Sequence, residues 1–245
     1  MIPLPHAILI WGATGGVGAA LARRLASAGT PLFLTARREE PLAALAVELD
    51  AAYATSDATD WSEIDRVADL ACERFGAIGG MANCVGSLLL KPAHLTKFEE
   101  FQQTIAQNLT SAFGVVRAAA RVMPDGGSIV LCSTAASRIG LSNHEAIAAA
   151  KGGVNGLVLS AAATYASRGL RVNAVAPGLV NTPLTARITG SAPAVQASQA
   201  MHPLGRIGQP SDVASLIAWL LGPDATWVTG QLYGIDGGLG TVRSK

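Results

Sequence analysis

The chain has 245 residues, enough for one α/β domain with a large core. Half of the residues are hydrophobic and only 14% are charged, where about 25% is average, so we expect self-association to cover the surplus apolar surface. The formal net charge of +1 gives no electrostatic reason to bind nucleic acid or an acidic membrane, and a small-molecule substrate is the expected partner.

The three cysteines, Cys72, Cys84 and Cys132, lack the spacing of metal ligands or of a redox motif. We interpret them as small apolar side chains in a cytoplasmic protein, where thiols stay reduced, and we expect no metal site. We also expect no signal peptide before the first strand and no apolar run that approaches membrane-spanning length.

Strand-like and helix-like stretches alternate along the chain. The first strand ends at Gly12, and further strands are predicted at 31–35, 51–55, 80–84, 128–133, 170–175 and 231–235. Helices are predicted at 19–28, 39–50, 61–75, 96–123, 143–166 and 211–221. This alternation predicts one Rossmann-type domain over 1–245, with a doubly wound parallel sheet of about seven strands and helices on both faces. The segment 183–203 fits the pattern least, and we expect it to be a mobile lid over the substrate.

A glycine-rich turn joins the first strand to the first helix. Gly12, Gly16 and Gly18 allow a sharp turn and a close approach of the backbone to a ligand. The free N–H groups of the helix that follows favour an anion such as a pyrophosphate. A glycine-rich loop alone is a weak signal, because it also occurs in a plain strand-helix turn.

Polar residues follow the other strands at the sheet edge where ligands of such folds bind. In chain order they are Arg37, Arg38, Asp57, Asn83, Gly86, Ser133, Thr134, Pro177, Gly178 and Thr182.

These motifs resemble those of the short-chain dehydrogenase/reductase family, in its ordinary single-domain branch. The resemblance runs from the glycine loop to Asp236-Gly237-Gly238 and includes Asn83-Cys84-Val85-Gly86. It also includes Asn108, Lys151 and the segment Arg171–Gly178 that leads to Thr182.

The resemblance implies a nicotinamide cofactor. NAD-preferring members place a carboxylate at the end of the second strand, where this chain has Ala36 followed by Arg37 and Arg38. An arginine pair can hold a 2′-phosphate, so we favour NADP(H) over NAD(H), with Arg37 as the better contact. Alternatively, both arginines are surface residues at the start of an exposed helix and bind no ligand. Asp57 would accept a hydrogen bond from the adenine amino group.

The resemblance assigns the remaining cofactor contacts residue by residue. Thr182 and the backbone after Pro177 would hold the nicotinamide amide. The other expected cofactor-binding residues are Gly12, Thr14, Gly15, Gly16, Val17, Gly18, Asn83, Gly86, Lys151, Gly178 and Val180.

The chain departs from the family pattern at the proton donor. Ordinary members carry a tyrosine four residues before the lysine, but here that position is Ile147, and the nearest tyrosine to it is Tyr165. The usual serine position holds Thr134, which preserves a hydroxyl. Asn108, Thr134 and Lys151 are therefore the candidate catalytic residues, and Ile147 stands at the usual tyrosine position.

Three interpretations remain open. In the first, the protein is an oxidoreductase of carbonyl or alcohol groups, and either His144 or a water held by Thr134 and Lys151 moves the proton. His144 could instead only begin the helix, because Ser142–Glu145 resembles a capping box. In the second, the protein binds NADP(H) without turnover, as a sensor, scaffold or partner subunit. In the third, it reduces imines or activated alkenes, which need no tyrosine.

The substrate itself is not encoded in an obvious motif. We expect residues 87–94 and the lid to line its pocket, with Lys91 and His94 as candidates to meet a polar end. Alanine-rich faces at 118–120 and 161–163 allow close helix packing, either across a subunit interface or against the protein's own sheet. The family resemblance implies a homodimer or homotetramer.

Overall fold

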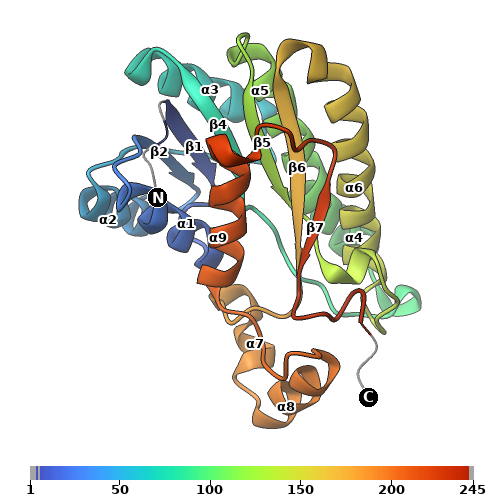
Figure 1. Cartoon of the computed structure of the whole chain (residues 1–245). Helices are drawn as coiled ribbons and strands as arrows, with labels where there is room; N and C mark the ends of the chain where they lie inside the picture. The colour runs from blue at the N-terminus through green and yellow to red at the C-terminus, as the bar shows by residue number, and fades with distance from the viewer. Residues whose placement is uncertain (1–3, 5, 243–245) are drawn as a thin grey trace.

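A computed structural model describes residue 4 and residues 6–242 of the chain. Its centre is a seven-stranded parallel sheet in the order β3-β2-β1-β4-β5-β6-β7, as predicted (Figure 1). The strands are β1 (Ala7–Trp11), β2 (Leu32–Ala36), β3 (Ala52–Thr55), β4 (Ile78–Asn83), β5 (Gly127–Cys132), β6 (Leu170–Pro177) and β7 (Leu232–Ile235). The ends of the predicted domain, 1–3 and 243–245, lie outside the described residues.

Helices cover both faces of the sheet, and every residue of the central strands β1 and β2 is therefore buried. Alternate residues of β1 show this: Ile8 and Ile10 pack with α1 and α9, and Leu9 and Trp11 pack with α3 and α5. One face carries α1 (Gly16–Ala26), α2 (Glu39–Leu49) and α9 (Pro210–Leu221). The other carries α3 (Trp61–Phe75), α4 (Phe98–Ile105), α5 (Ser111–Val122) and α6 (Glu145–Tyr165).

The long helix predicted over 96–123 is interrupted. A π-helical turn, η2 (Ala106–Thr110), separates α4 from α5 and contains the buried Asn108. A π turn holds about one residue more than an α-helical turn. The helical pattern of apolar residues continues on either side of it, so the sequence predicts one long helix. Such turns occur often at functional sites.

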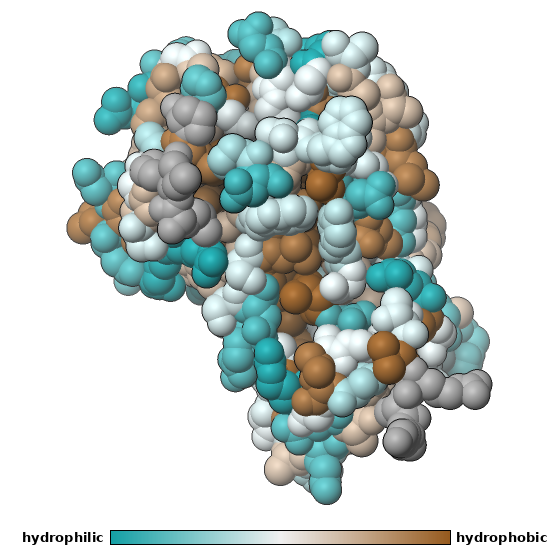
Figure 2. Space-filling model, in the orientation of Figure 1, coloured by the Kyte–Doolittle hydropathy of each residue, from teal (hydrophilic) through white to brown (hydrophobic). Residues whose placement is uncertain are grey.

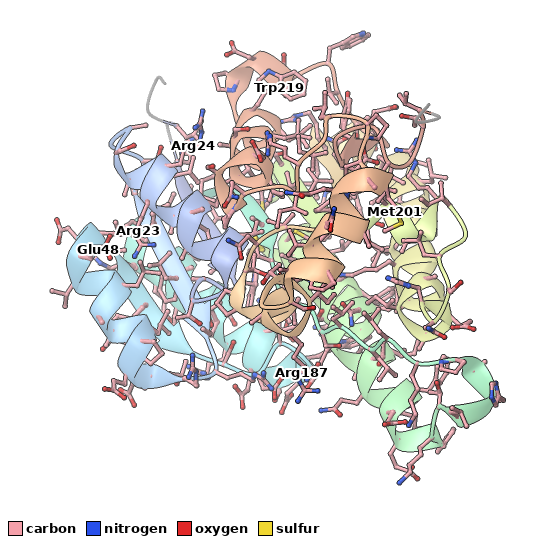
Figure 3. All side chains as sticks on the ribbon, turned by 90° about the horizontal axis from the view of Figure 1, so that it is seen from below. Arg23, Arg24, Glu48, Arg187, Met201 and Trp219 are labelled. Carbon is pink, nitrogen blue, oxygen red and sulfur yellow. The ribbon has the colours of Figure 1, made fainter. Side chains whose placement is uncertain are left out.

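The segment after β6 leaves the sheet, as its composition indicated. It forms η5 (Pro183–Thr185), α7 (Ala186–Thr189) and α8 (Ala192–Met201), which project beyond the strand ends below the sheet in Figure 1. Seen from below in Figure 3, these helices lie in front of the strands, with Arg187 and Met201 labelled on them. Mobility of the segment stays a prediction.

One prediction about the helices is wrong. The stretch Glu145–Arg168, with 24 residues, is long and apolar enough by length and composition to cross a membrane, whereas no such run was expected. Its face at Ala150, Val154 and Val158 is buried in the core, which is typical of a core helix.

Most of the alanines on these faces pack against the protein's own sheet, which is one of the two expected alternatives. Ala118, Ala119, Ala161 and Ala162 are buried in the core on the α3/α5/α6 side of the sheet, where small side chains let α5 and α6 come close to the strands. Ala120 is half-buried and Ala163 is exposed, and an interface between subunits stays a prediction.

Candidate active site

The glycine loop lies between β1 and α1, at the point where the order of the strands reverses. Gly12 has a φ of 74°, and its N–H donates to the Thr35 carbonyl at 2.9 Å. A Cβ on Gly18 would overlap the carbonyl oxygen of Gly12, and one on Gly16 would lie 2.7 Å from Cγ2 of Thr182. Only glycine fits these two positions, so the loop forms a narrow backbone cradle.

The first turn of α1 opens into this cradle. The helix begins after Gly15, which has no side chain to cap it, and no acidic residue lies in the first turn. Helix N–H groups without a capping side chain attract an anionic group. The loop therefore has the geometry to bind a pyrophosphate; Thr14 lies in the loop and Val17 in the first turn of α1. Their contacts with a cofactor stay predictions.

Two arginines follow β2 at the far end of the same edge. Arg37 and Arg38 are both exposed, and neither forms an ion pair with any of the described residues. Arg23 shows the contrast: it points toward Glu48 in Figure 3 and pairs with it at 2.6 Å. The guanidinium groups after β2 are thus available for an anionic ligand.

Asp57 lies after β3, and its carboxylate is held by a local turn. Its Oδ1 accepts hydrogen bonds from the backbone N–H of Thr59 at 2.9 Å and from the Thr59 hydroxyl at 2.8 Å. Oδ2 has no partner among the described residues, so it remains open to a donor such as an amino group.

The side chain of Asn83, by contrast, forms its hydrogen bonds within the protein. It is buried at the end of β4, where its Oδ1 accepts a hydrogen bond from the N–H of Val85 at 3.0 Å. Its Nδ2 lies 3.4 Å from Oγ of Ser111. Asn83 therefore shapes the turn that leads to Gly86.

Lys151 is buried on α6 and points to the end of β5. Its Nζ donates to the Cys132 carbonyl at 2.6 Å, and this is the one hydrogen bond that the described residues give it. Burial lowers the pKa of Lys151 to about 8. An ammonium group carries three donors, so two remain for a ligand.

Asn108 and Gly86 complete this part of the site. Asn108 donates to Oγ of Ser87 and to the Thr104 carbonyl, both at 2.9 Å, and its Oδ1 accepts from the N–H of Ser87. A Cβ added to Gly86 would lie 3.0 Å from Oδ1 of Asn108 and 3.7 Å from Nζ of Lys151. Three of the predicted residues therefore meet at one point.

Thr134 follows β5 and is positioned by a network that the sequence did not reveal. Oγ of Ser133 donates to Oδ1 of Asn155 at 2.6 Å, and Nδ2 of Asn155 donates to Oγ of Ser137 at 3.0 Å. Ser137 in turn donates to the Thr134 carbonyl at 2.7 Å. Asn155 lies four residues after Lys151, and this helical spacing is the signal that could have found it.

Ile147 lies one turn before Lys151 on α6 and is buried, with 3% exposure. All three tyrosines are among the described residues: Tyr53 is on β3, Tyr165 ends α6, and Tyr233 is on β7, where its ring packs against Trp219 of α9. Among the described residues, no tyrosine forms a hydrogen bond with Lys151.

His144 lies just before α6 and not in a capping box. Asn143 has a φ of 64°, so the predicted helix start at 143 is wrong, and α6 begins at Glu145. No side chain caps this helix. Nδ1 of His144 lies 2.7 Å from the Ser142 carbonyl, which can only accept, so Nδ1 carries a proton and Nε2 is the nitrogen that can exchange one.

The segment after β6 is anchored by a histidine that sequence reasoning missed. His202, at the end of α8, is buried; its Nε2 accepts from the N–H of Leu179 at 3.2 Å, and its Nδ1 donates to the Ser198 carbonyl. A Cβ on Gly178 would overlap His202. This contact fixes the backbone between Pro177 and Val180, and nothing in the sequence marks it.

Thr182 continues this segment toward the glycine loop. Its hydroxyl lies 3.1 Å from that of Thr185, whose own hydroxyl donates to the Val180 carbonyl. The predicted polar end of the substrate pocket is only partly available, because Lys91 pairs with Glu100 at 2.7 Å.

Comparison with known proteins agrees with this geometry. The family model described as "Enoyl-(Acyl carrier protein) reductase" matches residues 12–240. The chain is 34% identical over 243 residues to 3beta-hydroxysteroid dehydrogenase 1 of Eggerthella lenta, covering 95% of this chain and 92% of the relative. It is also 34% identical to cis-4-hydroxycyclohexanecarboxylate dehydrogenase of Sinomonas cyclohexanicum, covering 96% of each.

Solved structures show the same similarity. A short-chain type dehydrogenase/reductase from Mycobacterium ulcerans superposes with a TM-score of 0.94 at 30% identity, covering 100% of this chain and 93% of the other. An actinorhodin polyketide ketoreductase with NADPH gives 0.92 at 30% identity, covering 97% and 98%.

The chain thus belongs to the short-chain dehydrogenase/reductase family, a class of oxidoreductases that bind a nicotinamide cofactor. The relatives named above are oxidoreductases that act on alcohol or carbonyl groups.

Proposed function

We propose that this protein is an NADP(H)-dependent oxidoreductase that interconverts a carbonyl and an alcohol on a small molecule, with a proton donor other than tyrosine. The observation that supports this proposal most strongly is the buried Lys151. Two of its three N–H donors have no acceptor among the described residues, and the ammonium group lies beside Asn108 and Gly86. A buried ammonium with one partner is costly unless a ligand uses the others. A nicotinamide ribose supplies the hydroxyl groups that fit them.

The preference for NADP(H) rests on the residues after β2. A carboxylate there would repel a 2′-phosphate, but β2 ends at Ala36 and is followed by two exposed, unpaired arginines. A guanidinium group can bind a phosphate through two parallel hydrogen bonds. The ketoreductase with a similar structure was solved with NADPH, which agrees with this preference.

In this proposal the nucleotide supplies or takes up a hydride, and the chain's own residues do the rest. Thr134 holds the substrate oxygen through its hydroxyl, and the network through Ser137 and Asn155 keeps it in place. Lys151 holds the ribose. Asn108 fixes the loop at Ser87 that borders the pocket.

Two groups can move the proton in place of a phenol. His144 precedes Ile147 by one helical turn, and its Nε2 is the exchanging nitrogen. A water between Thr134 and Lys151 is the other. Removing a general acid typically costs about 10² to 10⁴ in rate, so turnover without tyrosine is slow but measurable.

A second function is favoured by the apolar side chain at Ile147. A substrate that takes up hydride without a strong acid, such as an activated alkene or imine, suits this apolar position better than a ketone. The matching family model carries the description of an enoyl reductase. If Ile147 leaves the site without any proton donor, the protein binds NADP(H) without turnover, which is the remaining interpretation.

We further propose that the protein is a cytoplasmic homo-oligomer. Phe113 on α5 and Leu159 on α6 are 48% and 63% exposed, and Phe113 stacks on Trp61 of α3. A second copy would cover this apolar surface.

The proposal is tested by titrating the purified protein with NADPH and NADH and following nucleotide fluorescence. We expect NADPH to bind at least tenfold more tightly, and NADPH to be consumed slowly with ketones or enones. Failure to bind either nucleotide would overturn both the enzymatic and the binding-only functions. Tight NADPH binding without consumption of any substrate would leave only the binding function.

A further inference from the structure

Two of the three cysteines lie side by side at the carboxyl ends of β4 and β5. These strands pair with Asn83 opposite Leu131, so the next residues in register are Cys84 and Cys132. The N–H of Cys84 donates to the Trp11 carbonyl at 2.9 Å, which keeps it in line with β4. Both side chains pack against the same core cluster, so they point to the same face of the sheet.

The spacing suits a disulfide. Neighbouring strands are about 4.8 Å apart, and the Cα atoms of bridged cysteines are usually about 4.4–6.8 Å apart. Both thiols are free and half-buried. A bond between them would need rotation of the side chains, not separation of the strands.

The two thiols differ in their electrostatic surroundings. The neighbouring Cys84 thiol lowers the pKa of Cys132, and the nearby Lys151 charge lowers it further, against the opposing effect of burial. The neighbouring Cys132 thiol, together with burial, raises the pKa of Cys84. One sulfur is therefore prepared to attack an oxidant while its neighbour keeps a proton, as in other reactive thiol pairs.

The pair also lies between the two halves of the site. A Cβ on Gly12 would lie 3.0 Å from the carbonyl carbon of Cys84, so Cys84 borders the glycine loop. The Cys132 carbonyl accepts the hydrogen bond of Lys151 at 2.6 Å. A shift of the backbone at Cys84 would move the glycine loop, and a shift at Cys132 would move the carbonyl that binds Lys151.

We propose that Cys84 and Cys132 form a peroxide-sensitive thiol pair, and that closing it to a disulfide weakens nucleotide binding. The modification stands on the register of the strands alone, whereas its effect on binding rests on the proposed function. The Cys72 thiol is not part of the pair, because it lies on α3 with its Sγ 4.0 Å from the Val122 carbonyl.

The chemistry balances with hydrogen peroxide as the oxidant. The Cys132 thiolate attacks peroxide: an S–O bond forms, the O–O bond breaks, and hydroxide leaves, which takes up a proton to give water. Cys84 then attacks the sulfenic sulfur; the S–S bond forms, the S–O bond breaks, and a second water leaves. Two thiols are oxidised and one peroxide is reduced, and a dithiol reductant reverses the change.

The experiment treats the unligated protein with hydrogen peroxide, denatures it in a thiol-blocking reagent, and counts free thiols by mass spectrometry. We expect the count to fall from three to one, with a cross-linked peptide pair that contains residues 84 and 132. Cys72→Ser is the matched control and should fall from two to none. Cys84→Ser and Cys132→Ser, tested separately, should form no intramolecular cross-link.

Nucleotide affinity is then measured before and after oxidation, and again after reduction. We expect NADPH to bind at least tenfold more weakly to the oxidised protein and to recover on reduction. Three free thiols after peroxide, or a cross-link through Cys72, would overturn the thiol pair. A cross-link between 84 and 132 with unchanged affinity would overturn the effect on binding. If the reduced protein binds no nucleotide, the proposed function fails while the cross-link result still stands.

Discussion

The two halves of the site follow the family pattern to different degrees. The half around β1, α1 and β2 keeps a narrow glycine cradle, an uncapped helix N-terminus and free arginines. The half around β5 and α6 keeps Thr134 and Lys151 but has Ile147 where a proton donor is expected. We therefore expect that binding of the nucleotide and exchange of the substrate proton can be changed separately by mutation.

Figure 2 shows a strip of apolar side chains between α9 and β7 that runs toward α7 and α8, with polar residues around it. The predictions below test the two halves of the site, from the largest expected effect to the smallest.

The largest effect is expected from Ile147→Tyr. A phenol placed one turn before Lys151 would restore a general acid, which contributes about 10² to 10⁴ in rate. We expect turnover of a ketone to rise by that factor while NADPH affinity stays within about threefold, as measured by steady-state kinetics. Ile147→Phe is the control, because it adds the ring without the hydroxyl. An equal gain in both variants would show that ring volume, and not the proton, is what Ile147 lacks.

Gly18→Ala should break the nucleotide half. The added methyl group would overlap the Gly12 carbonyl oxygen, so the cradle must open. We expect NADPH to bind about a hundredfold more weakly, or ~2.8 kcal/mol, by fluorescence titration. Gly152→Ala on α6, where nothing lies within 4 Å of the new Cβ, should leave binding unchanged. Unchanged affinity in Gly18→Ala would exclude the loop as the nucleotide site.

Arg37→Gln should reduce the preference for NADPH over NADH. A charge-assisted hydrogen bond contributes about 1.5–3 kcal/mol, so NADPH should bind about ten- to a hundredfold more weakly while NADH is unaffected. Arg24→Gln serves as the control, since Arg24 is an exposed arginine on α1 (Figure 3). An equal loss of affinity for NADPH and NADH would mean that Arg37 does not bind the 2′-phosphate.

The smallest effect concerns pH. Burial lowers the pKa of Lys151 from 10.5 to about 8, so the free protein loses this charge above about pH 8. We expect the NADPH dissociation constant to rise by less than about tenfold between pH 7 and 9. Lys151→Met should remove this dependence, and a slope that persists in the variant would assign it to another group.

The same shift affects stability. Between pH 8 and 10.5 the unfolded chain keeps a proton on Lys151 that the folded chain has released, so unfolding costs more free energy as the pH rises. Urea unfolding of the unligated protein at pH 8 and pH 10 measures this difference. Lys151→Met, which buries no charge, should show less of it.

The centre of the sheet was predictable because strands that are buried on both faces have a nearly continuous apolar sequence. β1 and β2 show this pattern directly. The arrangement at the strand ends followed from parallel topology alone. The π turn at Asn108, the start of α6 after Asn143 and the His202 contact were not predictable, because each depends on tertiary neighbours.

The surface that the alanines pack against was not predictable for a related reason. Alanine at 118, 119, 161 and 162 allows close packing against any surface, and composition cannot say which one. Asn155 and Ser137 were overlooked because uncharged polar residues on a long helix or loop are common. Their role comes only from the distances that join them to Thr134.

The central claim is that this protein transfers a hydride although no tyrosine lies near Lys151. The most direct test incubates the wild-type protein with deuterated NADPH, labelled on the transferable position, and a set of cyclohexanone and 3-ketosteroid substrates. Mass spectrometry of the products detects even a few turnovers. We predict an alcohol that carries one deuterium. Intact NADPH binding with no deuterium in any product would contradict the account and leave a nucleotide-binding protein.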